Sequence, residues 1–95
     1  MKKKRHPSII QDEKECYFCG NVLDLDLHHV MSGTNRRHLA DEDGLTVYLC
    51  RYHHNKVHQN RELNLLLKRV AQRRYMEYYD KTLEEYLKRY EKSFL

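Results

Sequence analysis

The segment "LCRYHHNKVH" at residues 49–58 places one cysteine and three histidines within ten residues. Upstream, "CYFCG" holds two more cysteines and "LHHV" holds two more histidines. Thiolates and imidazoles are the ligands that zinc prefers in proteins, and imidazole also suits several other divalent ions. The sequence therefore predicts metal binding, and the spacing of these residues divides them between two centres.

The first predicted centre consists of two short pairs of ligands. Cys16 and Cys19 are separated by two residues, and after thirty intervening residues Cys50 and His53 repeat that spacing. Two such knuckles supply four ligands at tetrahedral reach, which is how structural zinc is held. The alternative is three buried free cysteines and a surface histidine. A pair on each side favours the structural zinc.

The second predicted centre consists of histidines alone. His54 and His58 lie four residues apart and therefore share one face of a helix. One histidine of the pair His28–His29 would complete a three-nitrogen site, which leaves positions open for water and substrate, as in catalytic sites. The remaining histidine could act as a base, because imidazole titrates near neutral pH. Alternatively these histidines are surface residues, or share one zinc with the cysteines, although tetrahedral zinc cannot accept seven ligands.

Two strands and a short helix are expected to position these residues. The alternation "LDLDL" at 23–27 predicts a half-buried strand with the two histidines at its end. Residues 45–50 predict a second strand and 51–58 a short helix. Residues 31–44 lack periodicity and contain two glycines, which is typical of a loop.

The rest of the chain is expected to be helical. Asn60 can cap a long helix that ends near Asp80, and Thr82 with Glu85 fits the capping box that opens a final helix. The predicted fold class is α+β, with a zinc-stapled hairpin and short helix followed by C-terminal helices. The predicted organisation is a basic flexible arm over 1–12 and a single domain over 13–95, of which 13–60 form the metal-binding core and 61–95 the helical tail.

Length and composition limit the class of protein. The chain has 95 residues, of which 40% are hydrophobic, so its core is small and a metal staple would add stability. Lysine and arginine total 18 against 14 acidic residues, a net charge of +4 that suits a polyanionic partner. Neither a signal peptide nor a membrane span is expected, and the predicted location is cytoplasmic. Three cysteines in a reducing compartment favour metal ligands over disulfides.

The order of these motifs resembles a known family. "CxxC…HHV…LCxxHH…H" resembles an HNH nuclease of the ββα-metal (His-Me finger) type with an added zinc knuckle. More narrowly, "LHHVMSGTNRRHL", "DGLTVYLCRYHHN" and "EYLKRYEKSFL" are similar to small phage proteins of the RecA-dependent recombination-enhancement nuclease (Ref) family. The resemblance covers residues 16–95.

The resemblance implies a role for each matching histidine. It implies that His28 binds the catalytic ion and that His29 is the general base, while the two helix histidines bind the same ion. The matching structural zinc ligands are Cys16, Cys19, Cys50 and His53. The catalytic divalent ion would be Zn²⁺, Mn²⁺, Ni²⁺ or Mg²⁺, with three imidazoles least suited to Mg²⁺.

One position departs from the HNH pattern. The asparagine that usually orients the base is replaced near Leu45. Either Asn35 or a backbone carbonyl orients His29 instead, or the activity is weak.

The expected function is a metal-dependent HNH-type DNA endonuclease or nickase of phage recombination. Arg36, Arg37 and Arg51 flank the histidines and would contact phosphates, although each also suits a solvated surface. The expected partners are DNA, read with little sequence specificity, and a RecA-type recombinase filament. The alternatives are a weak or inactive zinc-binding module that binds nucleic acid or a recombinase, and a phage inhibitor of a host factor.

Overall fold

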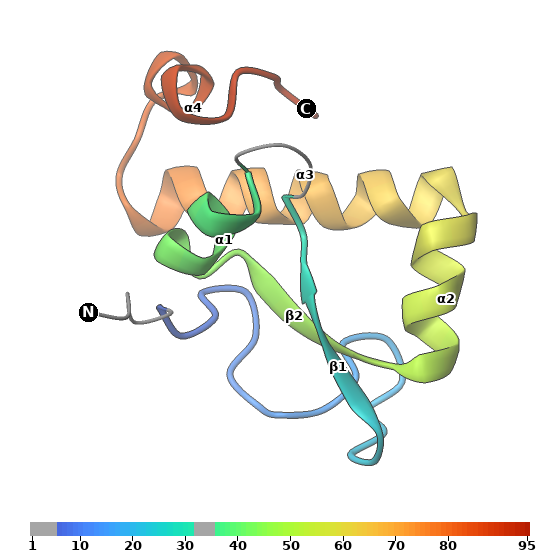
Figure 1. The fold of residues 1–95 in the computed structure, drawn as a ribbon. Helices are drawn as coiled ribbons and strands as arrows, with labels where there is room; N and C mark the ends of the chain where they lie inside the picture. The colour runs from blue at the N-terminus through green and yellow to red at the C-terminus, as the bar shows by residue number, and fades with distance from the viewer. Residues whose placement is uncertain (1–5, 32–35) are drawn as a thin grey trace.

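The fold combines one β-hairpin with helices. In the computed structural model, which describes residues 6–31 and 36–95, the described elements are two antiparallel strands and four helices (Figure 1). Their order and bounds are β1 Leu25–His29, α1 Arg37–Asp43, β2 Thr46–Cys50, α2 Arg51–Gln59, α3 Arg61–Tyr78 and α4 Leu83–Tyr90. The predicted α+β class is confirmed.

The hairpin and α2 form one continuous unit that carries five of the candidate ligands, namely His28, Cys50, His53, His54 and His58, while Cys16 and Cys19 precede β1. In the register of the hairpin, Leu25 pairs with Cys50 and His29 with Thr46. Helix α2 begins directly after β2, because the Cys50 side chain caps it by accepting a hydrogen bond from the His53 backbone N–H. The helix then lies beside the hairpin before the chain turns into α3 (Figure 1).

Strand β1 begins two residues later than the sequence predicts. Asp24 has a φ of 51°, a left-handed conformation that ends the preceding turn. Leu23 therefore belongs to that turn and is 68% exposed. The strand extends instead through His28 and His29, which are both buried.

The predicted loop at 31–44 is wrong in its second half, because residues Arg37–Asp43 form α1. The helix is too short to show a period, yet it buries Ala40 completely and ends at Gly44, whose φ is 76°. A Cβ on Gly44 would lie 2.3 Å from the Pro7 carbonyl oxygen, so only glycine fits this close approach.

The predicted caps of the helical tail are confirmed. The Asn60 side chain accepts from the backbone N–H groups of Glu62 and Leu63, and Thr82 and Glu85 form the reciprocal capping box. Much of the buried surface in this half is tyrosine. Tyr75, Tyr86 and Tyr90 are at most 6% exposed, and the rings of the last two stack with centroids 5.1 Å apart.

The N-terminal segment differs from the predicted flexible arm over residues 6–11. The backbone N–H of Ile9 donates to the Gly44 carbonyl, and the Ile9 side chain is buried in the core. The Gln11 side chain accepts from the Tyr48 backbone N–H, which lies on the edge of β2. Apolar burial and pairing with a strand edge therefore hold this segment against the domain. Residues 1–5 lie outside the described residues.

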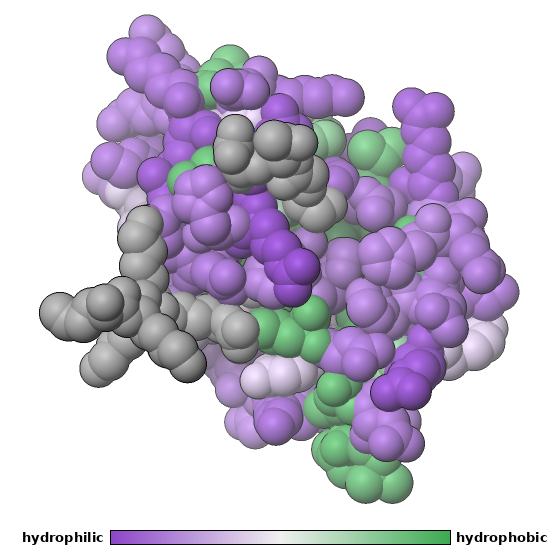
Figure 2. Space-filling view, viewed as in Figure 1, coloured by the Kyte–Doolittle hydropathy of each residue, from purple (hydrophilic) through white to green (hydrophobic). Residues whose placement is uncertain are grey.

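The visible surface is mostly hydrophilic (Figure 2). The exposed apolar side chains include Val22 and Leu23 in the turn before β1, at 66% and 68%. No helix in the described part of the chain combines the length and the apolar composition that a membrane crossing requires.

Candidate metal centres and the histidine pocket

Cys16, Cys19, Cys50 and His53 converge into one cluster that could hold a metal ion. The His53 Nδ1 atom lies 3.5 Å from Cys16 Sγ and 3.2 Å from Cys50 Sγ, and Cys19 Sγ lies 3.9 Å from Cys50 Sγ. In a tetrahedral zinc site, neighbouring ligand atoms lie about 3.6 Å (S to N) and about 3.8 Å (S to S) apart. The four ligand atoms therefore fit a single tetrahedral ion.

A tight turn positions the first two cysteines. The backbone N–H of Gly20 donates to the Cys16 carbonyl, and Gly20 itself adopts a φ of 78°. Burial opposes ionisation of Cys16, but hydrogen bonds from the backbone of Cys50, Cys19 and Phe18 lower the pKa of its thiol to about 6. A thiol with this pKa is largely the metal-binding thiolate at neutral pH.

His28, His54 and His58 form a second cluster that could hold a metal ion. The ring centroid of His28 lies 5.5 Å from the ring centroid of His54 and 5.6 Å from that of His58. The two helix histidines come closer, with 3.1 Å between their Nε2 atoms. Two imidazole ligands of one tetrahedral zinc ion have nitrogens about 3.3 Å apart, so this spacing fits a shared ion.

Asp26 orients one of these ligands. Its Oδ2 atom lies 3.0 Å from His54 Nδ1. A carboxylate only accepts hydrogen bonds, so Nδ1 carries the proton and, in the neutral ring, Nε2 carries the lone pair. That lone pair faces His58 Nε2, which is favourable only with a proton or a cation between the two nitrogens. A carboxylate behind a histidine in this way is the usual support of a metal-binding imidazole.

His28 lies deeper than the other two ligands and is 6% exposed. Burial, together with the charges of His54 and His58, lowers the pKa of His28 to about 4. The ring is therefore neutral at physiological pH, which is the form that binds metal ions.

His29 pairs with a different element from His28. Its Nε2 atom lies 2.7 Å from Asp41 Oδ1 on α1. Successive strand residues point to opposite sides, so His28 meets α2 while His29 meets α1. Both nevertheless line one pocket of about 260 Å³, together with Leu27, Arg37, His54 and His58.

Asp41 is the side-chain partner of His29, the position for which the sequence suggested Asn35 or a backbone carbonyl. Asn35 lies outside the described residues. Leu45, where the resemblance would place an asparagine, is completely buried in the apolar core and does not line the pocket. The acidic partner thus comes from α1, the helix that the sequence did not predict.

The three predicted phosphate-binding arginines lie in different surroundings. Arg37 lines the histidine pocket. Arg36 lies 3.5 Å from the exposed carboxylate of Glu91, and Arg51 lies 3.8 Å from Asp26 with 72% of its side chain exposed. Of the three, Arg37 is therefore best placed to contact a bound phosphate.

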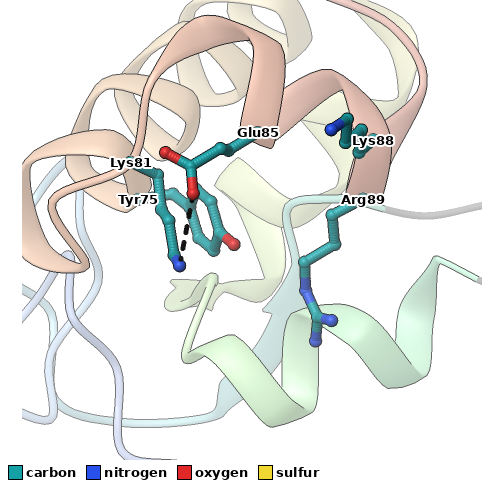
Figure 3. Close-up of a pocket in the computed structure, with 5 residues that line it drawn as sticks. All are labelled: Tyr75, Lys81, Glu85, Lys88 and Arg89. Carbon is teal, nitrogen blue, oxygen red and sulfur yellow. Dashed lines mark ion pairs between the residues drawn. The ribbon is translucent and has the colours of Figure 1, made fainter.

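A second cavity of about 400 Å³ lies between α3 and α4 (Figure 3). It is lined by Tyr75, Lys81, Glu85, Lys88 and Arg89. Lys81 pairs with Glu85 at 3.6 Å, and Arg89 binds the buried carboxylate of Asp43 at 2.6 Å. Because two of its three cations are already paired within the protein, this cavity is a weaker ligand site than the histidine pocket.

Sequence reasoning missed Asp26 and Asp41. The first carried a usable signal, because a period of two places Asp26 and His28 on the same face of one strand. Asp41 carried none, since its contact with His29 depends on how α1 packs. Comparison with protein-family models, with curated proteins and with solved structures finds no match to this chain.

Proposed function

We propose that this protein is a metal-dependent DNA endonuclease or nickase of the HNH type, with a structural zinc and a second, catalytic ion. One observation carries the proposal: three histidines that could hold a metal ion and a carboxylate-paired fourth histidine line the same pocket. Hydrolysis of a phosphodiester needs a base for water and positive charge beside the phosphate. The pocket provides candidates for both.

His29 is the proposed base. Asp41 accepts the hydrogen bond from Nε2–H, which leaves the lone pair on Nδ1. In the proposed reaction, Nδ1 takes a proton from water as the water oxygen bonds to the phosphorus. The bond from the phosphorus to the leaving 3′ oxygen breaks, and that oxygen takes up a proton from solvent. Asp41 stabilises the imidazolium that forms. His29 must be neutral for this step, because a protonated imidazole cannot accept the proton of water.

His28, His54 and His58 are the proposed ligands of the catalytic ion. When bound, a divalent ion supplies Lewis-acid stabilisation of the charge that grows on the phosphate oxygens. Asp26 holds His54 in the tautomer whose Nε2 would be free to bind such an ion. Three neutral nitrogen ligands suit Zn²⁺, Mn²⁺ or Ni²⁺ better than Mg²⁺.

DNA is the proposed substrate, with phosphate contacts from Arg37 at the pocket. The net charge of +4 favours a polyanion of any sequence. A RecA-type filament is a proposed partner, and it rests on the family resemblance alone.

Nicking of supercoiled plasmid tests the proposal. Wild type, His29→Ala and Asp41→Ala are incubated with Mn²⁺, Zn²⁺, Ni²⁺ or Mg²⁺, each with and without a RecA-type filament on homologous single-stranded DNA. We expect wild type to nick with at least one ion and His29→Ala to lose the activity. His38→Ala is the matched control, because it also replaces a histidine with alanine, but at an exposed position on α1.

The outcomes separate the two candidate functions. Loss of nicking in His29→Ala, with its fold and bound ions retained, supports a nuclease with this base. A wild type that binds DNA but cuts it under no ion, with or without filament, would refute the nuclease. A non-enzymatic zinc module that binds nucleic acid would then be the better assignment. Equal cleavage by wild type and His29→Ala would mean that the base is another group.

A further inference from the structure

Two lysines meet beside the histidine pocket, where α3 and the C-terminal segment come together, and the charge of Arg36 acts on one of them. Lys68 lies on α3, Arg36 precedes α1, and Lys92 follows α4. Lys68 and Lys92 lie 5.4 Å and 5.7 Å from the centroid of the same ring, that of Phe94. Lys68 Nζ also lies 3.5 Å from the carbonyl oxygen of Val30, the residue after His29.

The C-terminal segment is held firmly in this place. Gln72, which is completely buried, accepts from the Phe94 backbone N–H at 2.6 Å and donates to Ser93 Oγ at 3.0 Å. Arg69 donates to the Phe94 carbonyl at 2.9 Å. The two lysines are therefore kept on the Phe94 ring by the fold rather than meeting by chance on a loose tail.

The positive charge of this group is left largely uncompensated. Within the described ranges, no carboxylate forms an ion pair with Lys68 or Lys92, and Arg36 has only the exposed Glu91 at 3.5 Å. Burial, followed by the charges of Arg36 and Lys92, lowers the pKa of Lys68. Folding thus brings like charges together at a cost, which an anion bound among them would offset.

We infer that Lys68 and Lys92 form a binding site for a backbone phosphate of duplex DNA, next to the phosphate that is cut. Lys68 does not line the histidine pocket, yet it contacts the residue that follows His29. The phosphate it binds is therefore a neighbour of the reacting one and serves to position the strand. This inference rests on DNA as the substrate of the proposed function, and it assigns Lys68 to binding rather than to catalysis.

Binding of a fluorescein-labelled duplex, followed by anisotropy without added catalytic ion, tests the inference. Each phosphate contact contributes about −0.9 to the slope of the logarithm of the association constant against the logarithm of the salt concentration. Lys68→Met should therefore reduce the magnitude of this slope by about 0.9 and weaken binding about eightfold at about 0.1 M salt. Lys68→Arg should keep both values. Lys88→Met, on the exposed side of α4, removes the same charge elsewhere and should change neither.

Several results would overturn the inference. An unchanged slope in a folded Lys68→Met, or equal losses in Lys68→Met and Lys88→Met, would show that only net charge matters. Failure of wild type to bind the duplex would show that DNA is not the anion. If Lys68→Met does not fold, Lys92→Met replaces it with the same expected change.

Nicking kinetics then distinguish this inference from the proposed function. Lys68→Met should raise KM with kcat nearly unchanged, since the lost contact is made equally in the ground and transition states. A wild type that never nicks, with the slope difference present, would remove the nuclease and leave the phosphate site. Nicking by wild type with no slope difference would remove the phosphate site and leave the nuclease.

Discussion

Replacing Cys50 with serine is the sharpest test of the candidate structural metal centre. Cys50 has two functions, because its Sγ atom lies in the metal cluster and also caps α2 by accepting from the His53 N–H at 3.4 Å. Serine is among the best N-cap residues and a poor zinc ligand. Cys50→Ser therefore removes the ligand while it preserves the helix cap, so any loss of stability reports on the metal.

The expected loss follows from the energy of a four-ligand site. Structural zinc contributes about 10–16 kcal/mol in small zinc domains, so an equal share for each ligand is about 2.5–4 kcal/mol. In a domain of this size about 1 kcal/mol shifts Tm by about 4–8 °C, which predicts a decrease of about 10–30 °C. The assays are zinc content by atomic emission and thermal unfolding by circular dichroism.

Two controls make this result decisive. Thr46→Ser changes a buried residue of the same strand outside the cluster, and it should keep the zinc and lose only about 1 kcal/mol. In excess chelator, wild type and Cys50→Ser should unfold alike, because neither then holds the ion. A Cys50→Ser protein with full zinc content and unchanged Tm would refute the assignment of this centre.

Four further outcomes are expected. His58→Ala should lose the second ion but keep the cysteine-bound zinc and the fold, and loss of that zinc in metal analysis would contradict the division into two centres. Asp41→Asn should slow nicking about 10- to 100-fold with the ions retained, whereas an unchanged rate would exclude an orienting role. Acid should release zinc, because the lowered pKa of Cys16 favours the thiolate above about pH 6. The contribution of this thiolate to zinc binding is complete at high pH and is lost as the pH falls through about 6. Below that pH the zinc affinity should decrease about tenfold per pH unit, which a zinc-sensitive dye can follow. Arg89→Met should lower the free energy of unfolding, measured by urea titration, by about 2–3 kcal/mol, because it leaves the carboxylate of Asp43, 11% exposed, without its cation. An unchanged free energy of unfolding would show that this ion pair does not contribute to stability.

The residue types and their local spacing determined much of the candidate site. Cysteine and histidine pairs at fixed intervals predict a metal cluster, and the period of a helix places His54 and His58 on one face, which the structure also does. The helix caps at Asn60 and Thr82 were likewise predictable. Each of these features depends on residues within a few positions of one another.

The tertiary structure decided which partners lie behind these ligands. Asp41 reaches His29 only because α1 packs against β1, and a seven-residue helix held by burial has no periodic signature in the sequence. Lys68 and Lys92 meet at Phe94 because a buried glutamine holds the C-terminal segment against α3. Contacts between residues far apart in the chain depend on the packing of whole elements, which local spacing does not encode.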